Sequence, residues 1–209
     1  MAARVEKVVT SGTFNLDGGS WEVDNNVWLL GDDEQVLVID AAHDASAITA
    51  AVGEREVLAI ACTHGHDDHV NAAPALSSQV DAPVLLHPAD DVLWRLAHSS
   101  DRPSAALADG DVLRVAGVEV RVLHTPGHAP GAVCFHVPEL GVVFTGDTLF
   151  SGGPGATGRS YSDFGTIVDS IRSTLLTLPE ETVAHTGHGD DTTIGAEAPH
   201  VEEWIARGH

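Results

Sequence analysis

The sequence carries four side chains of metal-binding type within six consecutive positions. In the run Thr63-His64-Gly65-His66-Asp67-Asp68-His69, imidazole or carboxylate groups stand at His64, His66, Asp68 and His69. Metal binding explains nitrogen and oxygen ligands at this density better than any other role. His64 and His66 flank a glycine and can turn toward one ion, whereas Asp68 and His69 are offset enough to serve a neighbouring ion. The run therefore predicts a segment that supplies ligands to two metals.

Three further candidate ligands stand singly, each in a turn that contains glycine. His128 lies in Thr125-Pro126-Gly127-His128, Asp147 in Thr145-Gly146-Asp147-Thr148, and His188 in Thr186-Gly187-His188-Gly189. Each follows a segment that we expect to be a strand, and the ends of separate strands can converge on one edge of a layered sheet. His128 would complete a three-histidine site, His188 would complete the second site, and the Asp147 carboxylate can bridge two ions. We therefore expect a cleft that binds two divalent metals.

The elements that must position these residues alternate between strands and helices. Apolar runs and turn residues predict strands at 21–30, 36–40, 57–62, 83–87, 112–115, 118–123, 132–137, 142–145 and 182–184. Helical patterns and capping residues predict helices at 45–52, 71–79, 90–97, 164–176 and 196–206. Residues 31–34 have the composition of a hairpin turn, the run 63–69 is expected to be a loop, and 99–109 a polar loop. Because no linker or repeat divides the chain, we expect one α/β domain over residues 1–209.

Composition excludes several classes of partner. The formal charge of −21, from 31 acidic and 10 basic residues, repels phosphate backbones and argues against nucleic acid. No segment reaches the roughly 18 consecutive apolar residues of a membrane helix, and residues 1–10 carry charges where a signal peptide needs an apolar block. We therefore expect a cytoplasmic protein with no membrane partner. Cys62 and Cys134 fall inside expected strands, where we interpret them as small buried hydrophobic side chains.

Together, the four motifs resemble those of the metallo-β-lactamase superfamily. The resemblance rests on T-H-G-H-D-D-H at 63–69, T-P-G-H at 125–128, T-G-D-T-L-F at 145–150 and T-G-H-G at 186–189, in the family's order and spacing. It implies a four-layer αββα sandwich, in which two mixed sheets are flanked by helices and a dinuclear site lies at the edge between the sheets. It also implies that His64, His66 and His128 hold one metal, that Asp68, His69 and His188 hold the other, and that Asp147 bridges them. Asp40 resembles the aspartate that supports the ligands from behind.

Within this superfamily, the chain is more similar to the glyoxalase II branch than to the zinc β-lactamases, several of which carry cysteine at the position of Asp147. Glyoxalase II enzymes are hydroxyacylglutathione hydrolases, so the resemblance implies hydrolysis of an acyl thioester of a low-molecular-weight thiol. A metal-bound hydroxide would attack the thioester carbonyl, and Asp68 would be the catalytic residue that orients it as well as a ligand. Zinc is the first expectation for both ions, with iron and manganese as alternatives.

Other reactions stay open on the same set of residues. A persulfide dioxygenase would use one iron held by His64, His128 and Asp147, with open positions for oxygen. A lactonase or a phosphodiesterase of the same fold is a third alternative. The sequence is compatible with a homodimer as well as with a monomer.

Substrate recognition is expected in the segment 150–163, which resembles the Gly-Arg loop of short family members only at Gly158-Arg159. Arg159 and Tyr161 are therefore the candidates for binding a carboxylate or a sugar hydroxyl of the thiol carrier. Full-length glyoxalase II enzymes carry a C-terminal helical extension with thiol-binding residues, and this chain has no counterpart in the 21 residues after His188. The remaining histidines match no motif position and are interpreted as structural or exposed: His43, His87, His98, His124, His136, His185, His200 and His209. Of these, His185 is near enough to His188 to support the ligands.

Overall fold

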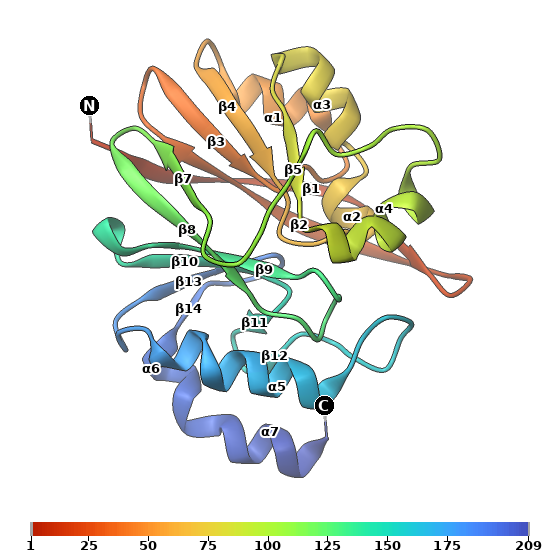
Figure 1. The fold of residues 1–209 in the computed structure, drawn as a ribbon, viewed down its shortest axis with the longest axis vertical. Coiled ribbons are helices and arrows are strands. Elements are labelled where there is room, and N and C mark those ends of the chain that lie inside the picture. The colour runs from red at the N-terminus through yellow and green to blue at the C-terminus, as the bar shows by residue number, and fades with distance from the viewer. Residues whose placement is uncertain (1, 209) are drawn as a thin grey trace.

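The fold is built on two six-stranded sheets, as a computed structural model of residues 2–208 shows (Figure 1). Met1 and His209, and with them the interpretation of His209, lie outside the described residues. The first sheet has the order β1-β2-β3-β4-β5-β6 and comprises β1 (Arg4–Leu16), β2 (Gly19–Gly31), β3 (Gln35–Ile39), β4 (Glu56–Ala61), β5 (Val84–Leu86) and β6 (Ala105–Ala106). Strands β1 to β3 are antiparallel and β3 to β6 are parallel, so the sheet is mixed.

The second sheet has the order β14-β13-β10-β9-β8-β7. It comprises β7 (Val112–Val115), β8 (Val118–His124), β9 (Val133–Val137), β10 (Val142–Gly146), β13 (Val183–Thr186) and β14 (Thr192–Thr193). Only the β10–β13 pair is parallel. A separate two-stranded ribbon joins β11 (Leu149–Phe150) to β12 (Gly153–Pro154).

Helices cover the outer face of each sheet (Figure 1). The first sheet is accompanied by α1 (Ala45–Val52), α2 (Asp67–Val70), α3 (Ala73–Val80) and α4 (Asp91–Ala97), and the second by α5 (Phe164–Ser173), α6 (Ile194–Glu197) and α7 (Val201–Arg207). Short 3₁₀ turns lie at η1 (Pro88–Asp90), η2 (Pro138–Leu140), η3 (Leu175–Thr177) and η4 (Ala198–His200). The expected αββα sandwich is therefore confirmed. No helix among the described residues is both long and apolar enough to cross a membrane.

Strand β3 shows why its sequence is apolar at almost every position. Val36 and Val38 pack into the cluster beneath α1 and α3, whereas Leu37 and Ile39 pack into the cluster between the sheets. Successive side chains of a strand point to opposite faces, so a strand covered on both sides needs apolar residues throughout. Strand β10 does the same, with Phe144 between the sheets and Val143 beneath α5. The strand ends that carry the candidate ligands are thus fixed by packing on both faces.

Strand β1 was not expected from the sequence. It pairs with β2 over its whole length, from Arg4 opposite Gly31 to Leu16 opposite Gly19, and Asp17-Gly18 closes the turn. Both turn residues have positive φ, 53° and 78°, which is the geometry that favours Asp-Gly in two-residue hairpins. Figure 1 shows this hairpin crossing the first sheet and extending beyond it. The Asp-Gly pair was the available signal for the hairpin.

Three other expectations need correction. The run 63–69 is a loop only as far as His66, because residues 67–70 form the helical turn α2. The expected helix at 196–206 is divided into α6, η4 and α7, since Pro199 has no N–H to continue the hydrogen-bond ladder. The segment 99–109, expected to be a polar loop, contains the short strand β6, which pairs with β5 at the edge of the first sheet. The other expected elements are present with boundaries that differ by a few residues, and the 31–34 turn joins β2 to β3 as expected.

Candidate metal centre

Asp40 organises the first ligand-bearing segment from behind. It follows β3 with a φ of +62°, and its carboxylate accepts hydrogen bonds from the Thr63 backbone N–H (2.7 Å) and the Thr63 hydroxyl (2.9 Å). The same carboxylate lies 2.9 Å from Nδ1 of His69. A proton held on Nδ1 by the carboxylate leaves Nε2 of His69 facing the other candidate ligands. The supporting position expected for Asp40 therefore agrees with its contacts.

The side chains of His64, His66 and His128 form one cluster of donor atoms within 4.8 Å of one another. Nδ1 of His66 lies 2.9 Å from Nε2 of His128, and the three rings are nearly perpendicular to their neighbours. Nδ1 of His128 donates to the Ala156 carbonyl at 2.8 Å, which directs its Nε2 inward. The geometry brings together the three residues expected to hold one metal.

Asp68, His69 and His188 form a second cluster. Nε2 of His188 lies 3.2 Å from Nε2 of His69 and 3.3 Å from Oδ2 of Asp68. Nδ1 of His188 donates to the Asp24 carbonyl at 2.7 Å, so strand β2 orients this ring. The helical turn α2 presents Asp68 and His69 on adjacent positions toward His188. The three residues expected to hold the other metal are also together.

Asp147 lies between the two clusters. Its Oδ1 is 3.3 Å from Nε2 of His69, and its Oδ2 is 3.6 Å from Nε2 of His128 and 3.4 Å from Nε2 of His188. A carboxylate in contact with imidazoles of both clusters has the position that a bridging ligand needs. Strand β10 supplies it, since Asp147 follows that strand directly.

The two clusters differ in the protonation of their side chains, because burial and neighbouring charges shift the pKa values of the ligands. Burial lowers the pKa of His64, and burial together with His128 lowers the pKa of His66 to about 3, so both rings are neutral. Burial opposes the charge of His188, but the carboxylates of Asp147 and Asp68 raise its pKa to about 10. Burial also opposes the charge of Asp68, while His69 and His188 lower its pKa to about 2. The first cluster offers neutral nitrogen donors, and the second places ionised carboxylates beside its imidazoles.

The donor set fits divalent metal ions. Nε2 of His64, Nε2 of His66 and Oδ1 of Asp147 are buried without a hydrogen-bond partner among the described residues. Buried polar atoms are rarely left unpaired, so these three point to a missing ligand. Imidazole and carboxylate donors suit zinc, iron and manganese. The arrangement therefore supports divalent metal binding.

A cleft of about 100 Å³ opens over both clusters. It is lined by Phe14, Val23, His66, Asp68, His128, Asp147, Ala156, Arg159 and His188. The Arg159 guanidinium carbon lies 3.9 Å from the centre of the Trp21 ring and 5.2 Å from that of Phe14, within the range of cation–π contacts. Tyr161, the other expected substrate residue, is 46% exposed and does not line this cleft. The structure brings Arg159, but not Tyr161, to the candidate ligands.

The β1–β2 hairpin forms one wall of the cleft, which the sequence interpretation missed. Asn15 donates from its backbone and side-chain nitrogens to both oxygens of Asp67, at 3.0 and 2.7 Å. On the other side, Asp17 accepts from the Ser160 N–H at 3.0 Å. The Ser160 side chain lowers the pKa of Asp17 most, the Ser160 N–H lowers it further, and the charge of Arg159 adds a smaller effect in the same direction. The hairpin tip is thus clamped to α2 and to the Arg159 loop.

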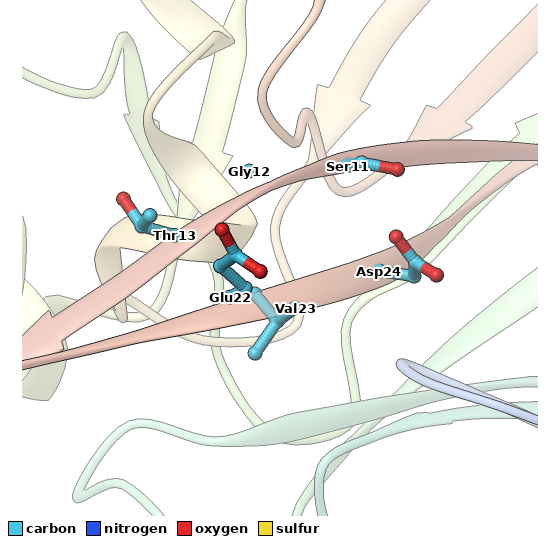
Figure 2. A pocket seen from close by; sticks show the side chains of 6 residues that line it. All are labelled: Ser11, Gly12, Thr13, Glu22, Val23 and Asp24. Carbon is cyan, nitrogen blue, oxygen red and sulfur yellow. The ribbon is translucent and has the colours of Figure 1, made fainter.

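A larger hollow of about 550 Å³ lies on the hairpin itself (Figure 2). Its lining residues are Ser11, Gly12, Thr13, Glu22, Val23 and Asp24. Figure 2 shows Val23 pointing to the opposite side of the strands from Glu22, and Val23 also lines the metal cleft. The hairpin therefore separates this hollow from the candidate ligands. None of the three donor groups lies in it.

Two histidines outside the motifs have contacts that bear on the ligands. His43, expected to be structural or exposed, has a structural role: its Nε2 bonds Oδ1 of Asn25 (2.8 Å), and Asn25 donates to Oδ2 of Asp68 (3.0 Å). His185 was expected to support the ligands, but its Nδ1 bonds Asp191 (2.9 Å) and its ring packs on Trp28. Asn25 and His43 support the second cluster, and His185 does not.

Both cysteines are buried, as expected. Burial raises the pKa of Cys134 to about 11 and raises that of Cys62. Neither thiol is a nucleophile at neutral pH, because the reactive form is the thiolate.

Comparison with known proteins agrees with this geometry. A profile of the metallo-beta-lactamase superfamily matches residues 21–188, a range that contains all seven candidate ligands. The chain is similar to the hydroxyacylglutathione hydrolase GloC of Haemophilus influenzae, with 35% identity over 188 residues that cover 82% of this chain and 89% of that protein. Among solved structures it is similar to TTHA1623 in a di-iron-bound form, with 34% identity, a TM-score of 0.76, and 90% and 96% of the two chains covered. It is also similar to ETHE1 from Myxococcus xanthus, with 26% identity, a TM-score of 0.73, and 94% and 88% covered.

Proposed function

The chain belongs to the metallo-beta-lactamase superfamily, and we propose that it hydrolyses an acyl thioester of a small thiol carrier. Superfamily membership and the converged histidine and aspartate donors support a hydrolase that binds divalent metal. The observation that carries the finer proposal is Asp147, a carboxylate between the two clusters at a position where several zinc β-lactamases have cysteine. The relative GloC is a hydroxyacylglutathione hydrolase by name, and a hydroxyacylglutathione is such a thioester.

Each cluster is assigned one ion. His64, His66 and His128 would hold the first, Asp68, His69 and His188 the second, and Asp147 would contact both. When bound, such a pair of ions lowers the pKa of a shared water and polarises the carbonyl that the water attacks. Zinc is the proposed metal, with iron and manganese as alternatives.

Asp68 is the proposed catalytic residue. It lines the cleft, and Asn25 donates to its Oδ2 at 3.0 Å, which fixes the plane of the carboxylate. With its pKa lowered to about 2, mainly by His69 against the opposing effect of burial, Asp68 is ionised at neutral pH and can orient the attacking water by accepting a hydrogen bond. A thioester releases a thiolate, which leaves without a strong general acid. The cleft lining contains no serine, threonine or cysteine, so no side-chain nucleophile of these types competes with water.

Arg159 is proposed to bind an anionic group of the thiol carrier. Arg159 lines the cleft, with its guanidinium carbon 3.9 Å from the centre of the Trp21 ring, and a planar fork of donors suits a carboxylate. The cleft volume of about 100 Å³ accommodates a small acyl group, so the carrier would extend past Arg159 toward solvent. Tyr161 lies exposed on the same loop and is proposed to contact the carrier at this outer end.

The proposal is tested by elemental analysis followed by activity assays on the same sample. The panel comprises acyl thioesters of several small thiols, a lactone, a phosphodiester and a β-lactam. The same assays are run on Asp147→Asn, in which the side chain keeps its size but loses the charge of the proposed bridging carboxylate. We expect two metal equivalents per chain, thioester cleavage, and a large loss of activity in Asp147→Asn. Metal-loaded protein that cleaves none of the thioesters would contradict the proposal.

A persulfide dioxygenase is the second candidate, and one observation favours it. His64 and Asp147 share a donor group, and Nε2 of His128 lies 3.6 Å from Oδ2 of Asp147, so two histidines and a carboxylate are available to a single iron. Oxygen consumption on a thiol persulfide by protein that holds one iron would establish this reaction. Thioester turnover at the same rate without oxygen would instead establish the hydrolase.

A further inference from the structure

Asp90 is a buried carboxylate that none of the steps above uses. Its side chain is fully buried, and each oxygen accepts one backbone N–H. Oδ2 accepts from Gly65 at 2.8 Å, and Oδ1 accepts from Gly131 at 2.5 Å. Gly65 stands between His64 and His66, and Gly131 lies three residues after His128. One side chain therefore joins the two loops that supply the three-histidine cluster.

The two glycines are required by the close approach of Asp90. A Cβ at Gly65 would lie 2.9 Å from the Asp90 carbonyl oxygen, and a Cβ at Gly131 would lie 2.8 Å from the Asp90 backbone nitrogen. Real Cβ atoms essentially never lie this near to other heavy atoms, and backbone atoms cannot swing aside as a flexible side chain can. Both loops are therefore packed against Asp90 as tightly as their backbones allow.

Asp90 itself stands on a rigid support. It ends η1, the turn that follows β5, and its own N–H bonds the His87 carbonyl at 3.0 Å. Helix α4 begins at the next residue. A second hydrogen bond also connects the segments of these two loops: the Val133 N–H donates to the Thr63 carbonyl at 2.8 Å. Asp90 adds the contact nearest to the ligands themselves.

Burying the Asp90 carboxylate costs free energy of desolvation. Burial raises the pKa of Asp90 to about 6, even though the N–H groups of Gly131 and Gly65 favour its charged form. An apolar side chain of similar size would avoid this cost but could not hold two backbone N–H groups at a set distance. The arrangement is therefore better suited to fixing geometry than to stabilising the fold.

We propose that Asp90 is a positioning residue that sets the separation between the loop of His64 and His66 and the loop of His128. It acts on the three-histidine cluster alone, because it makes no contact with Asp68, His69 or His188 in the described hydrogen bonds. This role is independent of which substrate the enzyme hydrolyses.

The test is the zinc affinity of the two clusters in Asp90→Asn. Asparagine keeps the shape but offers one acceptor oxygen, so one of the two loops loses its bond. Zinc is titrated into the metal-free full chain against a competing indicator, and His66→Gln and His188→Gln identify which binding step belongs to which cluster. We expect the three-histidine step to weaken about 10-fold or more, as losses of supporting contacts to metal ligands do, while the other step changes less than about 3-fold. The control is Asp91→Asn, an adjacent, partly exposed aspartate paired with Arg95, which should change neither step.

A second variant and a second readout separate positioning from a general structural role. In Gly131→Ala, the added Cβ would collide with Asp90 from the His128 loop, so zinc binding to the three-histidine cluster should again weaken. This variant provides the test if Asp90→Asn does not fold. In both variants, the visible absorption of bound cobalt should change only for the three-histidine step. Equal weakening of both steps, or no change in either, would overturn the proposal.

Discussion

Arg159 is a cation held against two aromatic rings in a protein whose formal charge is −21. A cation–π contact uses none of the hydrogen-bond donors of the guanidinium, so the group stays available to an anion while the two rings hold it at the cleft. The net negative charge repels anions in general, so an anionic group of the carrier needs a cation at the cleft in order to bind there.

Replacing Arg159 by alanine should raise KM for the best thioester roughly 10- to 100-fold, the range for losing a hydrogen bond to a charged group. The turnover number should change little, because Arg159 is placed at the carrier end of the cleft and not at the metal ligands. Steady-state kinetics of Arg159→Ala and of the exposed control Arg114→Ala check this expectation. An unchanged KM in Arg159→Ala would remove Arg159 from substrate binding.

Asp90 should leave a signature in the pH dependence of stability. Its pKa is about 6 in the folded protein and near the ordinary 3.8 when unfolded, so its protonated form is the one that folding favours. Its contribution is complete below about pH 4 and is lost as the pH rises through about 6, a difference of about 3 kcal/mol. Urea unfolding of metal-free protein should therefore show Asp90→Asn gaining about that much relative to wild type between about pH 4 and pH 7. A difference that does not vary with pH would contradict the shift.

The seven donor residues and Asp40 could be predicted because their signal is local: short motifs whose spacing already fits metal ligation. Asn25, His43 and Asp90 could not, because their roles arise from partners 18 to 43 positions away. An aspartate before a helix looks like a cap, and Asp90 looks so in sequence. Only the fold shows that the Asp90 carboxylate accepts hydrogen bonds from the N–H groups of Gly65 and Gly131.

At the scale of elements, the β1–β2 hairpin determines the shape of the cleft. Asn15 and Asp17 clamp its tip on two sides, and Phe14 and Trp21 supply the rings under Arg159. Four residues of one turn region therefore connect α2 to the loop of Arg159. The hairpin acts as a wall whose position is set from both sides of the cleft.

Trp21→Ala should reproduce part of the Arg159→Ala effect. Without the ring, the guanidinium loses its platform, and KM should rise several-fold while the turnover number holds. In the double variant the two effects should not add, because neighbouring groups in one contact are coupled. Kinetics of the full double-mutant cycle measure this coupling, with the exposed Val9→Ala on the same hairpin as control. Additive effects would show that the ring and the guanidinium act separately.

Most helices and strands could be predicted because their apolar patterns match one or two buried faces. Strand β1 escaped because its side chains are largely exposed or half-buried, so it lacks the apolar signal of β3 or β10. The helical turn α2 escaped because four residues are too short for a periodic pattern. The helix break at Pro199 was missed although proline is a helix breaker, because the sequence on both sides of it has helical periodicity.

At the scale of the molecule, the candidate ligands come from both sheets. His64, His66, Asp68 and His69 follow β4 of the first sheet, and His128, Asp147 and His188 lie after strands of the second. The sandwich could be inferred from the motifs through family resemblance, whereas the order of strands within each sheet could not. Strand order depends on pairing between distant segments, which hydrophobic patterns do not encode.

Metal removal should lower the thermal stability of the whole chain. Ions that bind only the folded state stabilise it by about 4 kcal/mol per site at a thousandfold excess over Kd. For a chain of this size, that corresponds to a fall in Tm of roughly 10 °C or more on chelation. Calorimetry with and without chelator measures the shift, and His188→Gln should retain about half of it. Equal melting temperatures with and without chelator would exclude a structural contribution from the metals.

The split of the ligands between the sheets also orders the assembly of the centre during synthesis. When the chain has emerged from the ribosome only as far as residue 100, it holds four of the seven donors, two for each cluster. His128 completes the first cluster and His188, 60 residues later, completes the second. The two ions can therefore be acquired at different moments, and the second only after residue 188 has been added to the chain.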